Sequence, residues 1–266
     1  MAISLGNAIS SIKEDEKWIP KILIGGAIGY IIPFVIGFIV GFVDALTGQQ
    51  NSLMGNLIIY TTSIVIGIYI TGFVFTTMNR VINSSDKFKM AEWNEKNLML
   101  TGLKTTLILI GWGIIMALIF LVLALIFGII GGIISFILAS CFHIEGNNLS
   151  IFITIFSCAC GAVVGLYIAQ FLNNAFACFL KTLRFKELIS FKKHFRMIKE
   201  NQHANWSLVG KNILLTLAIV AVAIVLMISV VGFVVLPFVY FAVYFVMYNL
   251  ICQYAKEIDI NKYIEE

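Results

Sequence analysis

The sequence predicts an all-α polytopic membrane bundle of about six transmembrane helices, arranged as three hairpins with cytoplasmic amphipathic segments between them. Composition is the first reason: 60% of the 266 residues are apolar and 12% are charged, about half the charged share of a soluble domain. Five stretches without Asp, Glu, Lys or Arg make up two thirds of the chain: 22–43, 45–79, 105–144, 146–180 and 212–255. A soluble helix needs a polar face, so the sequence excludes a soluble enzyme, a nucleic-acid-binding domain and a disulfide scaffold.

The first hairpin is predicted from apolar length. Residues 22–43 extend about 33 Å as a helix, enough for a bilayer core of about 30 Å, and Pro33 within them predicts a kink or local break. This run is long and follows a mixed-charge N-terminal segment, 1–21, so we expect an uncleaved helix rather than a signal peptide. A polar loop over 44–56 leads into a second helix at 57–78.

Basic residues orient the helices, because Lys and Arg collect on the cytoplasmic side of a membrane. Segments 1–21, 79–104 and 181–211 carry three, five and eight of them, whereas 44–56 and 143–149 carry none. We therefore expect a multi-pass protein of the plasma membrane. Segments 1–21, 79–104 and 181–211 and both termini would lie in the cytoplasm. This orientation requires the third apolar stretch to cross an odd number of times.

The third apolar stretch is too long for one straight crossing. We predict one crossing at 105–127 and a break marked by Gly128, Gly131 and Gly132. Residues 128–142 would then form a re-entrant helix, an interfacial helix or an extension of the crossing helix.

The remaining crossings complete the domain. A fourth is predicted at 151–178, and the last apolar stretch is long enough for two, at 212–231 and 233–253, with Gly232 and Pro237 at the turn. The predicted divisions are an N-terminal segment 1–21, a single transmembrane domain 22–255 and a cytoplasmic tail 256–266.

Two stretches carry recognisable motifs, one before the first hairpin and one before the second. The motifs are Glu16-Lys17-Trp18-Ile19-Pro20-Lys21, Arg80-Val81-Ile82, Glu92-Trp93 and Gly102-Leu103-Lys104. Together with Pro33, they resemble the prokaryotic membrane family known as domain of unknown function 4013, over about residues 10–250 in general pattern. The family usually has Pro before Glu-Trp, and this chain has Ala91. The resemblance implies the topology above and leaves the mechanism open.

Tryptophans and glycines indicate how the helices are anchored and packed. Trp18, Trp93 and Trp206 each precede a hairpin and are predicted to be interface anchors. Small residues four apart let helices approach closely, so the Gly-x-x-x-Gly pairs predict tight packing or a dimer face. The four pairs are Gly25/Gly29, Gly37/Gly41, Gly128/Gly132 and Gly161/Gly165.

One polar cluster lies within the predicted fourth crossing. Gln170, Asn173 and Asn174 follow i, i+3, i+4 spacing and therefore share one helix face. Two interpretations are open: hydrogen bonds between helices, or a polar substrate site.

A basic amphipathic segment is the strongest local feature. Its apolar stripe consists of Leu188, Phe191, Phe195 and Ile198. The bordering cations are Lys186, Lys192, Lys193, Arg196 and Lys199. On one helix this pattern suits the inner headgroup layer, where anionic lipid attracts each basic residue by about 1 kcal/mol. Two alternatives are open for this segment: it enforces the topology alone, or it docks a cytoplasmic protein.

The remaining polar residues do not point to catalysis. No charged residue interrupts an apolar stretch, which argues against an ion-driven pump. The five cysteines form no Cys-x-x-Cys pair, and the three histidines match no metal motif. We expect no enzyme activity, no catalytic residue, no metal, no cofactor and no nucleic-acid partner.

The leading hypothesis is a non-catalytic scaffold or accessory subunit. It would contact the lipid bilayer, including anionic lipids, and pack with other membrane proteins or a second copy. The alternative is a passive carrier or channel for a small or lipid-like solute.

Overall fold

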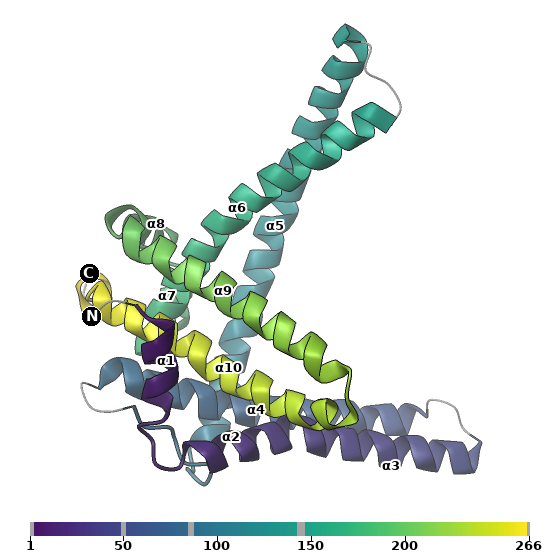
Figure 1. Ribbon diagram of the computed structural model, residues 1–266, viewed down its shortest axis with the longest axis vertical. Coiled ribbons are helices and arrows are strands. Elements are labelled where there is room, and N and C mark those ends of the chain that lie inside the picture. Colours follow the sequence, from purple (N-terminus) through teal and green to yellow (C-terminus); the bar gives the residue numbers. More distant parts are fainter. Residues whose placement is uncertain (1–2, 49–51, 85–87, 143–146, 265–266) are drawn as a thin grey trace.

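The computed structural model describes residues 3–48, 52–84, 88–142 and 147–264, and every regular element in these ranges is helical (Figure 1). The helices are α1 (Leu5–Ile12), α2 (Trp18–Gly26), the π-helical η1 (Ala27–Ile31), α3 (Ile32–Thr47), α4 (Leu53–Asn83), α5 (Leu98–Phe142), α6 (Asn147–Thr182), α7 (Phe185–Leu188), α8 (Phe191–Glu200), α9 (Gln202–Met227), α10 (Val230–Glu257) and α11 (Asn261–Ile264). The predicted all-α class is confirmed.

Six helical stretches among the described residues are long and apolar enough to cross a membrane, in agreement with the predicted bundle. The stretches are Trp18–Thr47, Leu53–Asn83, Leu98–Ile137, Ile153–Thr182, Gln202–Met227 and Val234–Glu257. They form three hairpins, and α1, α7, α8 and the chain ends lie together at one end of the molecule (Figure 1). The α10 helix packs along α2, η1 and α4, whereas the α5–α6 hairpin diverges from the other two hairpins. We name the shared end the base and the far ends of the hairpins the tips.

Pro33 alters the first span without interrupting it. The proline nitrogen cannot donate to the carbonyl four residues earlier, and the preceding turn widens into η1. The Ile32 N–H bonds there to the carbonyl of Ala27, five residues back. Pro33 then lies in the first turn of α3, where no intrahelical N–H is needed.

The structure continues α5 through the predicted break. Gly128, Gly131 and Gly132 lie inside this single helix of 45 residues, which ends at Phe142. Of the three alternatives predicted for residues 128–142, the structure agrees with an extension of the crossing helix. Glycine costs a helix only about 1 kcal/mol per residue, whereas unpaired backbone groups cost several kcal/mol each in lipid.

The turn between α9 and α10 lies earlier than predicted, at Ile228 and Ser229. The Ser229 hydroxyl caps α10 by accepting the Gly232 N–H at 3.0 Å. A Cβ atom on Gly232 would lie 1.8 Å from the carbonyl oxygen of Leu226, so this tight turn requires glycine. Pro237 lies inside α10 instead of at the turn.

The closest helix crossing joins α4 to α5. A Cβ atom on Gly72 would lie 1.9 Å from the carbonyl oxygen of Leu98, and one on Gly102 would lie 1.9 Å from that of Ile68. The two backbones are therefore in direct contact. Neither glycine belongs to a Gly-x-x-x-Gly pair, so the pattern used to predict close packing did not identify this crossing.

The predicted glycine pairs contribute less to packing within the chain than expected. In the first pair, Gly25 lies against the Phe241 ring and Gly29 lies near Ile70. Six other paired glycines have no described atom within 4 Å of their Cβ positions: Gly37, Gly41, Gly128, Gly132, Gly161 and Gly165. These three pairs therefore pack no helices together in the described part of the chain.

The buried core lies toward the base. Its fully buried large side chains include Phe73, Met78, Phe179, Leu180, Phe245 and Tyr254. They come from the parts of α4, α6 and α10 that are nearest the base, while large apolar side chains toward the tips are exposed. Lipid is as apolar as these side chains, so exposure at the tips carries no hydrophobic penalty in a membrane.

Gly102→Ala is expected to destabilise the protein by about 1–3 kcal/mol, because the added methyl group meets a backbone carbonyl. Gly113→Ala is the matched control on the same helix, since no described atom lies within 4 Å of its Cβ position. Thermal unfolding in detergent, followed by circular dichroism, measures both variants. Equal unfolding temperatures would contradict the crossing.

Candidate functional site

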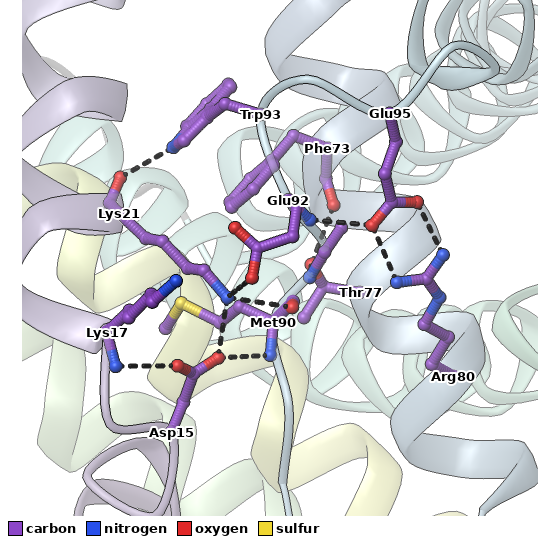
Figure 2. Close-up of polar contacts among 11 residues, drawn as sticks. Asp15, Lys17, Lys21, Phe73, Thr77, Arg80, Met90, Glu92, Trp93 and Glu95 are labelled. Atoms are coloured by element: carbon purple, nitrogen blue, oxygen red, sulfur yellow. Dashed lines mark hydrogen bonds and ion pairs between the residues drawn. The ribbon is translucent and has the colours of Figure 1, made fainter.

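A buried ion cluster at the base joins the segment before α2 to the segment before α5 (Figure 2). Lys21 Nζ lies 2.9 Å from Asp15 Oδ2 and 2.9 Å from Glu92 Oε1. The side chains of Lys21 and Asp15 are 4% and 5% exposed, whereas that of Glu92 is 44% exposed. Burying charge this deeply is tolerated only when the other donors and acceptors of both groups are also paired.

That requirement is met at both buried groups. Lys21 Nζ donates a further hydrogen bond to the carbonyl oxygen of Met90 at 3.1 Å. Asp15 also accepts the backbone N–H groups of Lys17 at 2.9 Å and Met90 at 2.8 Å. Burial by itself would raise the pKa of Asp15, but the hydrogen bonds from Lys21 and these two N–H groups outweigh it. The pKa of Asp15 therefore lies below its ordinary value.

An aromatic stack extends the cluster. The Trp93 ring lies parallel to that of Phe73, with 3.7 Å between their centroids. Trp93 Nε1 donates to the carbonyl oxygen of Lys21 at 3.0 Å, and the Tyr69 hydroxyl donates to the carbonyl oxygen of Trp93. The indole therefore joins α4 to the first turn of α2 (Figure 2).

Two further contacts fix the segment before α5 onto α4. The Thr77 hydroxyl accepts the Ala91 N–H at 3.0 Å and donates to the Phe73 carbonyl at 2.8 Å. The Arg80 guanidinium binds both carboxylate oxygens of Glu95, at 2.8 and 2.5 Å, and this bonding lowers the pKa of Glu95. The family that the motifs resemble usually has proline at the position of Ala91. Proline has no backbone N–H, so it could not donate the hydrogen bond that Ala91 gives to Thr77.

The cluster combines both motif stretches in a clamp between the first and second hairpins. Lys21, Glu92 and Trp93 belong to the motifs, but sequence reasoning missed Asp15 and the carbonyl of Met90. The available signal was an acidic residue six positions before Lys21 in the mixed-charge segment. Because the buried donors and acceptors are already paired, the arrangement suits a structural role better than acid–base chemistry.

The predicted intramembrane polar cluster forms hydrogen bonds between helices. Asn174 is fully buried; its Nδ2 donates to Asn205 Oδ1 at 2.6 Å, and its Oδ1 accepts the Tyr254 hydroxyl at 2.6 Å. These bonds join α6 to α9 and α10. Asn173 Oδ1 accepts a longer bond of 3.4 Å from α9, and buried Gln170 leaves its Nε2 without a partner among the described residues.

The three tryptophans predicted as interface anchors have different environments. Trp206 is 43% exposed and meets the edge of Tyr167, an arrangement compatible with an anchor. Trp18 is half-buried and packs against the core. Trp93 differs most from the expectation, because its indole stacks and hydrogen-bonds inside the protein.

The predicted basic helix is interrupted between Leu188 and Phe191, where α7 ends and α8 begins. The apolar stripe is divided accordingly: Leu188 is fully buried and Phe191 packs against the core, whereas Phe195 is 64% exposed. Four of the five predicted cations line one pocket: Lys186, Lys192, Lys193 and Arg196. Lys199 does not line it.

His194 in α8 is completely buried against Phe171, with 5.1 Å between the ring centroids. Neither ring nitrogen has a hydrogen-bond partner of normal geometry among the described residues. Burial lowers the pKa of His194 to about 4 despite the nearby carbonyls of Glu187 and Leu188, so the ring is neutral near pH 7.

A second pocket at the base, of about 700 Å³, lies among α1 and the ends of α4 and α10. Its polar lining includes Asn7, Ser10, Lys181, Asn249 and Gln253. Gln170, Asn173 and Asn174 line neither this pocket nor the basic one. The structure therefore does not bring the predicted polar cluster to either opening.

Lys21→Met is expected to destabilise the protein by about 3–5 kcal/mol, because it leaves the Asp15 carboxylate buried without its cation. Adding Asp15→Asn should restore part of the loss. Lys17→Met is the matched control, since that side chain is exposed and only its backbone N–H contacts Asp15. Unfolding by SDS in mixed micelles measures the free energies. A similar loss for Lys17→Met would refute the clamp.

The stability contributed by Asp15 should depend on pH. Its pKa is lower in the folded than in the unfolded protein, so ionised Asp15 stabilises the fold above the unfolded value, near pH 4. This contribution is lost as pH falls from there through the folded pKa. Unfolding temperatures of wild type and Asp15→Asn should therefore differ at pH 6 and converge below about pH 4. A difference that is constant with pH would argue against an ionised Asp15.

Comparison with known proteins identifies a family. The family model described as Protein of unknown function (DUF4013) matches residues 56–236, about two thirds of the chain. The match includes the clamp residues Arg80, Glu92 and Trp93, and both glycines of the α4–α5 crossing. No curated protein and no solved structure matches. The chain belongs to the DUF4013 family, as its motifs predicted.

Proposed function

We propose that this protein is a non-catalytic accessory or scaffold subunit, and that a transmembrane helix of another membrane protein packs against its α5–α6 hairpin. One observation carries the proposal: α5 is longer than a bilayer can cover. From Thr105 to Phe142 it has 38 residues and no Asp, Glu, Lys or Arg, a length of about 57 Å.

Tilting does not remove the excess length. At a tilt of about 40°, near the upper limit for transmembrane helices, a core of about 30 Å takes up about 26 residues. About a dozen uncharged residues of α5 then lie beyond the hydrocarbon. An apolar surface of that extent needs a protein cover if lipid does not supply one.

The chain itself supplies little cover for this hairpin. Only 6% of the most apolar window of α5 is buried, the lowest share among the six spans. The hairpin leaves the other two and extends away from them (Figure 1). The pairs Gly128/Gly132 and Gly161/Gly165 have open space at their Cβ positions, and such faces admit a close helix neighbour.

The interior polar groups support a role without catalysis. Lys21 and Asp15 use their hydrogen-bonding groups on each other and on the backbone, and Asn174 links three helices. These bonds hold the base together, as a scaffold requires. A substrate would have to displace them at a cost of about 1–3 kcal/mol for each buried group left unpaired.

A passive carrier for a small solute is the second candidate. The 700 Å³ pocket at the base supports it, because amide, hydroxyl and ammonium groups converge there. That pocket would be an entry site on one side of the membrane.

We propose the plasma membrane as the location, and the positive-inside rule supports an orientation with the base in the cytoplasm. Segments 1–21, 79–104 and 181–211 of the sequence carry 16 Lys and Arg residues, whereas the described residues of the connections at the tips carry none.

The proposal predicts that the wild type, purified in mild detergent, retains a stoichiometric membrane-protein partner. Gly161→Leu/Gly165→Leu should reduce the retained partner at least about tenfold, because two leucines fill the open face of α6. Gly37→Leu/Gly41→Leu is the matched control, since it places the same side chains on an equally open face of α3. Quantitative mass spectrometry measures the ratio of partner to chain.

Equal retention by both double variants would refute docking on α5–α6. Light scattering distinguishes a second copy of the chain from a different protein. If no partner is retained and proteoliposomes swell faster in glycerol than empty vesicles, the carrier replaces the scaffold as the proposed function.

A further inference from the structure

We infer that three tyrosines of the first and third hairpins form a contact with a second copy of this chain inside the membrane. Tyr30 lies in η1, and Tyr240 and Tyr244 lie in α10. Tyr30 and Tyr244 are 41% and 51% exposed, and Tyr240 is half-buried. The contact does not use the α5–α6 hairpin, and the inference does not depend on the proposed function.

Close packing of α10 along the first span brings the three side chains together. A Cβ atom on Gly26 would lie 2.4 Å from Cδ1 of Phe238, so the two helices are in tight contact there. The α10 helix also packs against η1. The Tyr30 side chain interacts electrostatically with those of Tyr240 and Tyr244. The three phenol groups therefore form one cluster, which we name the tyrosine face.

The tyrosine face lies deep in the membrane and not at its surface. Along the first span, Tyr30 is about 14 Å from Lys21 and about 21 Å from Asp44, the nearest charged residues on either side. Tyr244 is about 18 Å from Lys256 and about 21 Å from the N-terminal end of α10. Membrane tyrosines are enriched at the interfaces, where headgroups and water can bind their hydroxyls. Hydrocarbon at the depth of this face offers no such partner.

The polar atoms of the tyrosine face lack partners within the chain. Among the residues that the structure describes, none hydrogen-bonds to the hydroxyl of Tyr30, Tyr240 or Tyr244. Pro33 has no N–H, so a carbonyl oxygen of the turn that contains Tyr30 also lacks its backbone donor. This carbonyl is independent of the hydroxyls and lies at the same level of the membrane. Side-chain hydroxyls within a membrane commonly bond to a neighbouring helix, which indicates a protein contact at this face.

Two features favour a second copy over an unrelated helix. Each tyrosine hydroxyl can both donate and accept a hydrogen bond, so the face is complementary to itself. Two copies inserted with the same topology also hold each residue at the same depth, and a two-fold axis along the membrane normal brings equal levels together. Residues 22–43 and 230–255 carry no charge, so no like charges oppose each other across this contact.

The test compares two double variants that each remove the hydroxyl groups of two exposed tyrosines in membrane spans. Tyr30→Phe/Tyr244→Phe changes the tyrosine face, and Tyr60→Phe/Tyr167→Phe is the matched control on α4 and α6. Phenylalanine keeps the ring, so both variants should fold, and thermal unfolding in detergent checks this. Sedimentation equilibrium in detergent and energy transfer between labelled copies in liposomes measure the monomer–dimer equilibrium.

The wild type should dimerise, and Tyr30→Phe/Tyr244→Phe should weaken dimerisation at least about tenfold. Tyr60→Phe/Tyr167→Phe should dimerise like the wild type. Gly161→Leu/Gly165→Leu should also leave the dimer intact, which separates this contact from docking on α5–α6. Equal weakening in both tyrosine variants, no weakening in the first, or a wild type that is monomeric in liposomes overturns the inference.

Discussion

The buried ammonium of Lys21 sets the main constraint on this fold. A charge that is 4% exposed at the end of an apolar helix must have its donors paired, and its partners come from two separate segments. Asp15 precedes α2, while Met90 and Glu92 precede α5. Satisfying one cation therefore brings the starts of two hairpins together, and the Trp93–Phe73 stack packs α4 into the same contact.

Once the base is fixed in this way, the tips need not meet. In water, exposed leucine and isoleucine would draw the hairpins together, but lipid removes that driving force. Contact is then made where backbones approach closely, at Gly72 and Gly102, or where polar groups pair, as Asn174 does. The divergence of α5–α6 and its uncovered apolar length follow from the same physics, and they are the grounds for proposing a helical partner.

The basic pocket and the uncovered apolar hairpin lie in different parts of the molecule. The α7–α8 pocket gathers positive charge at the base, whereas the outer part of α5–α6 has no charged residue in its described apolar stretch. The clamp around Lys21 holds the starts of the first two hairpins together.

The sequence by itself determined the class, the number of apolar spans and the family, because apolar length, local charge and short motifs are properties of contiguous residues. Only the tertiary structure decided which polar groups pair: Asp15 with Lys21, Asn174 with Tyr254, and Trp93 with Phe73. It also decided which glycines carry a crossing, since Gly72 and Gly102 belong to no pair. The physical reason is that such contacts depend on which helix faces meet, and residues far apart in the chain make them.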